Sequence, residues 1–196
     1  KDEIFVSESG LISIAGGKLT GYRKMAESIV DLVGKQFQEE EGKLFSSAQT
    51  KELRISGGDV GGSKGFANYI KEKVAEGKRL GMEEEQARSL VKRYGSNIDV
   101  IFELYQQAKS EAQTENLDPI VLTVLRYSLE YELAYKPVDF FIRRTGAMFF
   151  DIHWVREHKE QVIDYMAEAL QWSNEQKEEY TKELEQLMKE ATHPVA

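Results

Sequence analysis

The fold of the first part of this chain is decided by residues 9–33, SGLISIAGGKLTGYRKMAESIVDLV. The segment opens with a short apolar run rich in β-branched residues, Leu11 to Ala15, which predicts a β-strand. The run breaks at Gly16-Gly17, and from about Gly21 to Gln38 apolar residues recur at the spacing of one helix face. Thr20 is the expected N-cap, because its side-chain oxygen can accept a hydrogen bond from a first-turn N–H group.

A strand, a glycine turn and a helix N-terminus in this order direct free N–H groups and the positive end of a helix dipole toward a ligand. Lys18 adds a mobile cation at the same place. A Gly-Gly turn also lets a strand enter a helix tightly without binding anything. The residue pattern alone therefore fits two interpretations equally well, an anion or cofactor site and a purely structural turn.

The composition excludes several classes of function. The chain of 196 residues carries 26 Lys and Arg against 34 Asp and Glu, and this net charge of −8 argues against nucleic-acid partners. It has no cysteine, which rules out disulfides, thiolate chemistry and cysteine metal sites, and suits a reducing compartment. No apolar run approaches the roughly 20 residues that a membrane-spanning helix needs. A hydrophobic content of 41 % nevertheless predicts a folded protein.

The N-terminal strand patterns are too few for a complete sheet. Besides Leu11 to Ala15, only Ile4 to Val6 reads as a strand near this end, and two short strands alone are marginally stable. We therefore expect residues 1–41 to be the closing strand–turn–helix of a domain whose sheet lies in a preceding segment. Residues 42–62 are rich in small and polar residues and predict a linker. Their glycine pairs lack the strand-to-helix context of a phosphate loop, so we favour a connector.

Residues 63–196 read as an all-α domain of six or seven helices. Ser63 is the expected cap of the first of them. Residues 87, 90, 91 and 94 are apolar at helical spacing, and Gly95 follows as a natural stop. Asp118-Pro119 is a cap followed by a first-turn proline, and the segment behind it, Ile120 to Leu133, is apolar enough to be the central buried helix.

Three further helices complete the expected domain. A short one opens at Pro137 and halts near Gly146, and a long one runs from about Asp151 to Leu170. Ser173 and Gln176 then form a capping box at the start of the last helix. The predicted fold class is accordingly mainly α, with a C-terminal helical bundle behind a short strand–turn–helix.

Other candidate chemistry is weak. His153 and His158 are five residues apart and do not share a helix face as a zinc pair would, so no metal site is predicted. His158 is expected to be a hydrogen-bonded core residue. No nucleophile motif occurs. Arg143-Arg144 suits phosphate binding, but we favour a structural pairing of one arginine with Glu130 or Glu132, because an unpaired charge in an apolar context is costly.

Two stretches resemble a known family. Residues 9–27 resemble the closing segment of the flavin domain in FAD-dependent glycerol-3-phosphate dehydrogenases and oxidases. The run from Arg126 to Ala134, followed by Pro137, Asp139 and Arg143-Arg144-Thr145, is similar to the C-terminal helical domain of the same family. The resemblance implies that residues 1–41 are a remnant of an FAD-binding domain.

The resemblance also implies a reaction. Enzymes of this family oxidise sn-glycerol 3-phosphate to dihydroxyacetone phosphate by hydride transfer from C2 to flavin N5. Lys18 matches a position near the substrate phosphate, and Gly21 stands where the family more commonly has Thr. The dinucleotide-binding fingerprint is absent, so we expect the isolated chain neither to hold FAD tightly nor to turn over. The cofactor-binding residues implied to lie beside the isoalloxazine ring are Gly16, Gly17, Lys18, Leu19 and Thr20.

The partners implied by the resemblance are the upstream FAD-binding domain, glycerol 3-phosphate, and a quinone or oxygen as electron acceptor. It allows a homo-oligomer, and a cytoplasmic location with peripheral contact at the inner face of the cell membrane. The leading hypothesis is a quinone-linked dehydrogenase whose helical domain is a cap or assembly module, and the alternatives are an oxidase and a non-catalytic helical interaction module. The cap hypothesis predicts exposed apolar surface near residues 4–30, and the interaction module predicts a large exposed apolar face elsewhere.

Overall fold

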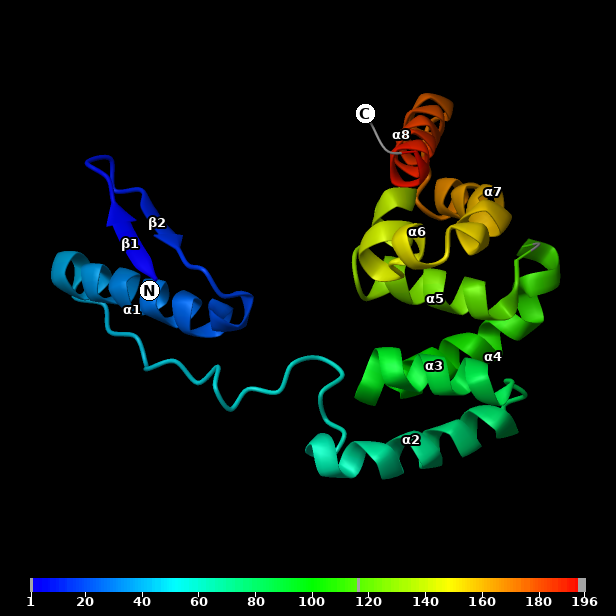
Figure 1. Cartoon of the computed structure of the whole chain (residues 1–196), viewed down its shortest axis with the longest axis horizontal. Helices are drawn as coiled ribbons and strands as arrows, with labels where there is room; N and C mark the ends of the chain where they lie inside the picture. Colours follow the sequence, from blue (N-terminus) through cyan, green and yellow to red (C-terminus); the bar gives the residue numbers. More distant parts are fainter. Residues whose placement is uncertain (1, 116, 194–196) are drawn as a thin grey trace. The chain divides into compact units, whose positions relative to one another are not determined.

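A computed structural model describes residues 2–115 and 117–193 and shows the mainly α fold that the sequence predicts (Figure 1). Internal contacts divide the chain into two compact units, residues 1–55 and 56–196. The first unit holds a β-hairpin and one long helix, and the second is helical throughout its regular structure.

The first unit contains the two predicted strands. β1 (Glu3–Val6) pairs antiparallel with β2 (Ile12–Ala15), so that Glu3 lies opposite Ala15 and Val6 opposite Ile12. A 3₁₀ turn (Leu19–Gly21) leads into α1 (Tyr22–Glu41), and the hairpin lies along this helix (Figure 1). Both strand predictions are confirmed, and the helix extends three residues beyond the predicted end.

The predicted N-cap at Thr20 is wrong. Thr20 lies inside the 3₁₀ turn, where the Gly21 N–H donates to the Lys18 carbonyl at 3.0 Å. The α-helix proper starts one residue later than this cap would place it, at Tyr22, and Gly21 at its N-cap offers no side-chain hydrogen bond. The 3₁₀ turn thus replaces a side-chain cap by tightening the backbone at the helix entrance.

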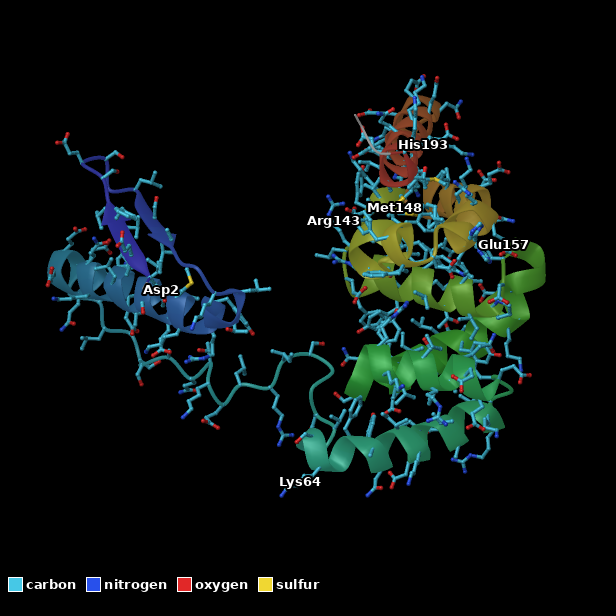
Figure 2. The ribbon with its side chains drawn as sticks, viewed as in Figure 1. Asp2, Lys64, Arg143, Met148, Glu157 and His193 are labelled. Carbon is cyan, nitrogen blue, oxygen red and sulfur yellow. The ribbon has the colours of Figure 1, made fainter. Side chains whose placement is uncertain are left out.

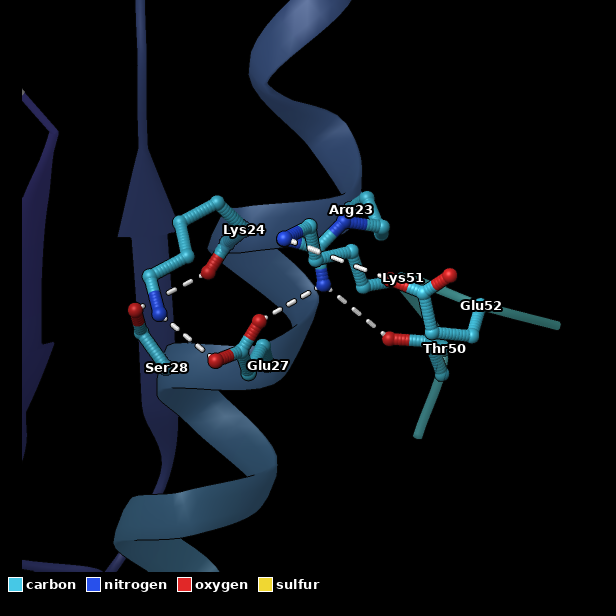
Figure 3. A network of polar contacts seen from close by, with 7 residues as sticks. All are labelled: Arg23, Lys24, Glu27, Ser28, Thr50, Lys51 and Glu52. Carbon is cyan, nitrogen blue, oxygen red and sulfur yellow. Dashed lines mark hydrogen bonds and ion pairs between the residues drawn. The ribbon is translucent and has the colours of Figure 1, made fainter. Parts of the chain in front are cut away.

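The segment after α1 is held to the helix by a polar network (Figure 3). The Arg23 guanidinium donates to Glu27 at 2.6 Å and to the Thr50 hydroxyl at 3.1 Å. Lys24 donates to the other oxygen of the Glu27 carboxylate at 2.6 Å. These two cations lower the pKa of Glu27, Lys24 most strongly. Arg23 therefore joins residues 27 positions apart, so the stretch around Thr50 packs as part of the first unit.

The second unit contains seven α-helices and one π-helix among its described residues. The predictions of a helix ending before Gly95, a capped helix at Asp118-Pro119 and a capping box at Ser173 are confirmed. The elements are α2 (Gly62–Arg79), α3 (Glu84–Tyr94), a 3₁₀ turn (Gly95–Asn97), α4 (Ile98–Glu115), α5 (Pro119–Glu130), a π-helix (Asp139–Arg144), α6 (Ala147–Phe150), α7 (Ile152–Ala169) and α8 (Asn174–Thr192).

Two local predictions in this unit need correction. Ser63 does not cap α2, because the helix already begins at Gly62 after Gly61 adopts a left-handed conformation with φ of +74°. The short helix expected behind Pro137 is a π-helix, whose wider turn carries the buried rings of Phe140 and Phe141.

The core is centred on α5, as its apolar sequence predicts. Leu122 and Leu125 are completely buried, and the Asp118 side chain caps the helix by accepting from the N–H groups of Ile120 and Val121 at 2.8 and 3.2 Å. The predicted central helix ends three residues earlier than expected, at Glu130. Burial of the apolar face of α5 rather than helix propensity supplies most of its stability.

A glycine contact attaches the start of this unit to the turn between α3 and α4. The Gly57 carbonyl accepts a hydrogen bond from the Ser96 N–H at 3.0 Å, and the Ser56 hydroxyl accepts one from Asn97 at 2.7 Å. A Cβ atom at Gly95 would lie 2.0 Å from the Gly57 oxygen. The backbones can approach this closely only because both residues lack a side chain.

Leu133 marks a strained turn after α5. Its φ is +54° although it is not glycine, and its side chain is 83 % exposed. We expect Leu133→Gly to stabilise the chain by about 0.5–1 kcal/mol, because relief of the left-handed strain exceeds the entropic cost of glycine. Thermal denaturation should show a Tm about 2 °C higher. An unchanged or lower Tm would contradict the assigned strain.

Arg126 joins three helices of this unit. Its guanidinium hydrogen bonds to Glu111 on α4 and to the Tyr165 hydroxyl on α7, the latter at 2.8 Å. The bond from Arg126 lowers the pKa of Glu111, and the same bond raises the pKa of Arg126. A carboxylate with a lowered pKa stabilises the fold above its unfolded pKa, and this contribution disappears as the pH falls through the folded pKa.

We therefore expect Glu111→Gln to lower the free energy of unfolding at pH 7. The difference from the wild type should shrink as the pH falls below the ordinary carboxyl pKa of about 4.3. Urea denaturation between neutral and acid pH measures it. Glu103→Gln, on the exposed side of the same helix, is the control and should show no such pH-dependent difference.

Candidate functional site

The turn that joins β2 to α1 is the candidate site. Gly16, Gly17, Lys18, Leu19 and Thr20 are all exposed, and the Leu19 side chain is 91 % exposed. They follow the last residue of β2 directly and lead into the 3₁₀ turn. The structure thus brings together all five residues implied to contact the cofactor, on one continuous surface of the first unit.

The backbone of the turn leaves hydrogen-bond donors available. The first intrahelical hydrogen bond is the one from the Gly21 N–H to the Lys18 carbonyl, so the N–H groups of Leu19 and Thr20 precede the bonded part of the helix. Behind them α1 continues to Glu41. Its dipole places partial positive charge at the turn, which favours an anionic group there.

The two glycines of the turn have different surroundings. A Cβ at Gly16 would lie 2.6 Å from an Asp2 carboxylate oxygen and 2.8 Å from the Met25 sulfur, so these two flexible side-chain ends would have to move to accommodate it. A Cβ at Gly17 would meet nothing within 4 Å. Gly17 therefore presents open backbone, which suits the close approach of a flat ring. No pattern in the sequence indicated that Asp2 and Met25 flank the site.

Lys18 supplies the cation of the site. Its backbone is extended, with φ of −121° and ψ of +118°, and its side chain is exposed. The carboxylate of Glu27, in the second turn of α1, is paired with Arg23 and Lys24. Among the described residues the Lys18 ammonium has neither a hydrogen bond nor an ion pair. A flexible ammonium beside free N–H groups can bind a phosphate.

Gly21 departs from the threonine that is more common in the family pattern. A Cβ at this position would meet nothing within 4 Å, and the residue adopts an ordinary helical φ of −82°. A threonine would therefore fit here, and the glycine removes a hydroxyl without any packing reason in the first unit.

Several large apolar side chains of the first unit are exposed. Phe5, Leu11 and Tyr22 are each between 55 % and 67 % exposed, and every residue of β1 is exposed. This is the exposed apolar surface near residues 4–30 that the cap hypothesis predicts. Large apolar side chains are also exposed in the helical unit, notably Phe149 and Phe150.

The other candidates have structural partners. Arg144 pairs with Glu132, as expected, with 3.7 Å between Nε and the carboxylate. Arg143 instead pairs with Asp139 at 2.8 Å, and it points outward from the helical unit (Figure 2). The expected apolar context around Arg143 is wrong, because its side chain is 58 % exposed.

The histidines of the described residues form no second candidate site. The Nδ1 atom of half-buried His158 lies 2.9 Å from the Trp154 carbonyl, which agrees with the hydrogen-bonded role expected of it. Across residues 2–115 and 117–193 no group of three or more potential ligands could hold a metal ion. In the same residues no helix combines the length and apolarity that crossing a membrane requires.

Comparison with known proteins identifies the family. Residues 48–177 match the family described as the C-terminal domain of alpha-glycerophosphate oxidase. The chain is 49 % identical over 195 residues to the aerobic glycerol-3-phosphate dehydrogenase of Bacillus subtilis, covering all of this chain and 35 % of that protein. It is likewise 49 % identical to the enzyme of the same name from Staphylococcus aureus strain USA300, covering 98 % of this chain and 34 % of that protein.

A solved structure agrees with this result. The glycerol-3-phosphate dehydrogenase from Bacillus halodurans, complexed with FAD, superposes with a TM-score of 0.92 at 43 % identity, covering 99 % of this chain and 38 % of that one. The chain thus spans about a third of the length of the relatives that it matches. By both sequence and fold, this chain belongs to the family of the C-terminal domain of alpha-glycerophosphate oxidase, shared with the aerobic glycerol-3-phosphate dehydrogenases.

Proposed function

We propose that the full-length protein oxidises sn-glycerol 3-phosphate to dihydroxyacetone phosphate with FAD as its cofactor. When bound, FAD supplies the acceptor for the hydride that leaves C2 of the substrate. The observation that carries the proposal is the exposed turn from Gly16 to Thr20, which combines open backbone, free N–H groups and a cation in a chain 49 % identical to an aerobic glycerol-3-phosphate dehydrogenase.

We assign a separate role in binding to each part of the turn. The N–H groups of Leu19 and Thr20 and the N-terminus of α1 favour negative charge near N1 and the C2 carbonyl of the ring. Gly17 keeps the space beside the ring free of side chains, and Gly16 lets the backbone turn toward it without a side chain of its own. The Lys18 ammonium holds the phosphate of the substrate through a charge-assisted hydrogen bond.

A quinone is the proposed electron acceptor, and oxygen is the alternative. The curated relatives named above are aerobic dehydrogenases, whereas the matching family model is named after an oxidase. Oxygen consumption by the full-length protein, with and without a quinone analogue, separates the two. A quinone-linked enzyme should consume little oxygen alone and should reduce the analogue rapidly.

The proposed organisation assigns residues 1–41 to the end of the FAD-binding domain, 42–62 to a linker and 63–196 to a helical cap or assembly module. The exposed apolar side chains of the first unit support an upstream FAD-binding domain as its partner. We further propose a cytoplasmic location with peripheral contact at the inner face of the cell membrane, and a homo-oligomer. The exposed Phe149 and Phe150 favour an interaction role of the helical unit as the second candidate.

Dye reduction by the full-length protein tests the proposed reaction. We expect saturable reduction of a redox dye with glycerol 3-phosphate, and a far smaller rate with glycerol, because only the phosphate engages Lys18. Equal rates with both substrates, or none with either after FAD is added, would contradict the proposal.

The isolated chain of 196 residues should not hold the cofactor by itself. It offers the exposed edge at residues 16–20 but lacks the dinucleotide-binding fingerprint that binds the pyrophosphate. Titration of the chain with FAD, followed by flavin fluorescence, should show no binding at micromolar concentrations. A Kd of about 1 μM or tighter, which corresponds to roughly −8 kcal/mol, would overturn this prediction.

A further inference from the structure

The helical unit carries a groove that the proposed reaction does not use. It has a volume of about 710 Å³ and lies between α3, the first turns of α5, α6 and α7. Leu90, Val121, Val124 and Ala147 form an apolar floor, and each of them is at most 7 % exposed. Trp154 adds a half-buried ring. A mainly apolar hollow of this size is typical of a binding site.

An exposed phenylalanine stands at the edge of the groove. Phe150 is among the residues that line it and is 90 % exposed, although it belongs to the same short helix as the buried Ala147 and Met148. Phe149, the residue before it, is 65 % exposed but does not line the groove. Aromatic rings that remain in water beside an apolar hollow are typical anchors of a protein interface.

The rim of the groove is acidic. The rim carboxylates are Glu85, Asp118, Asp151 and Glu157. All four are exposed, and Arg93 is the one lysine or arginine among the described residues that line the groove. Asp118 and Asp151 also cap α5 and α7, which fixes their carboxylates in place. This net negative rim repels anionic lipid surfaces, nucleic acids and acidic peptides.

The acids stand on different walls of the groove. Glu85 is carried by α3 and Glu157 by α7, and Glu157 lies on the side of the unit away from Arg143 (Figure 2). A ligand that matches this arrangement needs an apolar stripe flanked on both sides by positive charges. An amphipathic helix with lysine or arginine beside its apolar residues has this form.

We propose that this groove binds a basic amphipathic helix of a partner protein, with its apolar residues on the floor and beside Phe150 and its cations against the acidic rim. Fluorescence anisotropy with the full chain of 196 residues tests this. The probe is a labelled peptide of Leu and Lys, with Leu at helical spacings i, i+3, i+4 and i+7. We expect saturable binding that weakens as the NaCl concentration rises, since screening acts on the rim charges.

Matched variants locate the binding. Phe150→Ser should weaken it about tenfold, whereas Phe149→Ser should leave it nearly unchanged. Both rings are exposed, so neither substitution should affect folding. Glu157→Lys should weaken binding about fivefold at low salt, because a rim attraction becomes a repulsion. Glu160→Lys, one turn further along α7 and also exposed, makes the same charge change outside the groove.

Several outcomes would overturn the proposal. One is the absence of saturable binding of the Leu/Lys peptide, and another is equally tight binding of a peptide with Glu in place of Lys. A third is an equal loss of affinity in Phe150→Ser and Phe149→Ser, or in Glu157→Lys and Glu160→Lys. The full-length Phe150→Ser protein should reduce the dye at the wild-type rate, so the proposed reaction is tested separately from the groove.

Discussion

Replacing Lys18 with alanine in the full-length protein is expected to lower kcat/KM for glycerol 3-phosphate about 100-fold. The Lys18 ammonium has no hydrogen bond or ion pair among the described residues, so its removal should take away only the proposed charge-assisted hydrogen bond to the substrate phosphate. Such bonds contribute about 1.5–3 kcal/mol, which corresponds to a factor of roughly 10 to 150. Because the phosphate is held equally in the ground and transition states, the change should be mainly in KM.

Two variants control this experiment. Lys24→Ala removes a lysine one turn into α1 whose ammonium is bonded to Glu27 at 2.6 Å, so it should leave kcat/KM nearly unchanged. Lys18→Arg keeps the charge and should restore much of the affinity. The Tm of Lys18→Ala should equal that of the wild type, because the side chain is exposed. A loss no greater than that of Lys24→Ala would show that Lys18 does not contact the substrate.

The elements of the fold with strong local signals were predictable from the sequence. The existence of strands near residues 4–6 and 11–15 follows from their apolar, β-branched runs, although their pairing with each other was not predicted. The helix α5 follows from the Asp118-Pro119 start and the apolar segment behind it. The Ser173 capping box was predictable for the same reason, since both partners lie within one helical turn. Each of these signals is contained in a few consecutive residues.

Errors arose where backbone geometry decides between similar local choices. Thr20 and Ser63 are both good capping residues, yet a 3₁₀ turn and a left-handed Gly61 start the respective helices at other positions. Arg144 forms the expected ion pair with Glu132, but Arg143 pairs with Asp139, one helical turn before it. The type of a residue tells which hydrogen bonds and ion pairs would be favourable for it. It does not determine which of these the folded chain forms.

The features that depend on distant residues could not be read from the sequence. The Asp2 and Met25 atoms beside Gly16 come from opposite sides of the turn, and the groove floor collects residues from helices far apart in the chain. The turn at residues 16–20 had a pattern that fits both a ligand site and a tight corner. Only its exposure and the open space at Gly17 favour the ligand site, since a corner needs neither.

Replacing Gly95 with alanine is expected to destabilise the helical unit by about 3 kcal/mol or more. The backbone of Gly95 has φ of +52° and ψ of −127°, which is strained for any residue with a side chain. The new Cβ would also lie 2.0 Å from the Gly57 carbonyl oxygen, so the segment at Gly57 must separate from the turn after α3. Thermal denaturation should show a Tm about 10 °C lower.

Two further variants separate backbone strain from loss of the contact. Gly81→Ala has the same kind of strain, with φ of +94°, but its nearest atom is the flexible end of Lys109, so about 1–2 kcal/mol is expected. Gly57→Ala disrupts the contact from the opposite side, where a Cβ would lie 2.7 Å from the Tyr94 oxygen. If one shared contact is lost, the double variant of Gly57 and Gly95 must cost less than the sum of the single variants. Additive losses, or a Gly95→Ala loss no larger than that of Gly81→Ala, would mean that each glycine relieves only its own backbone strain.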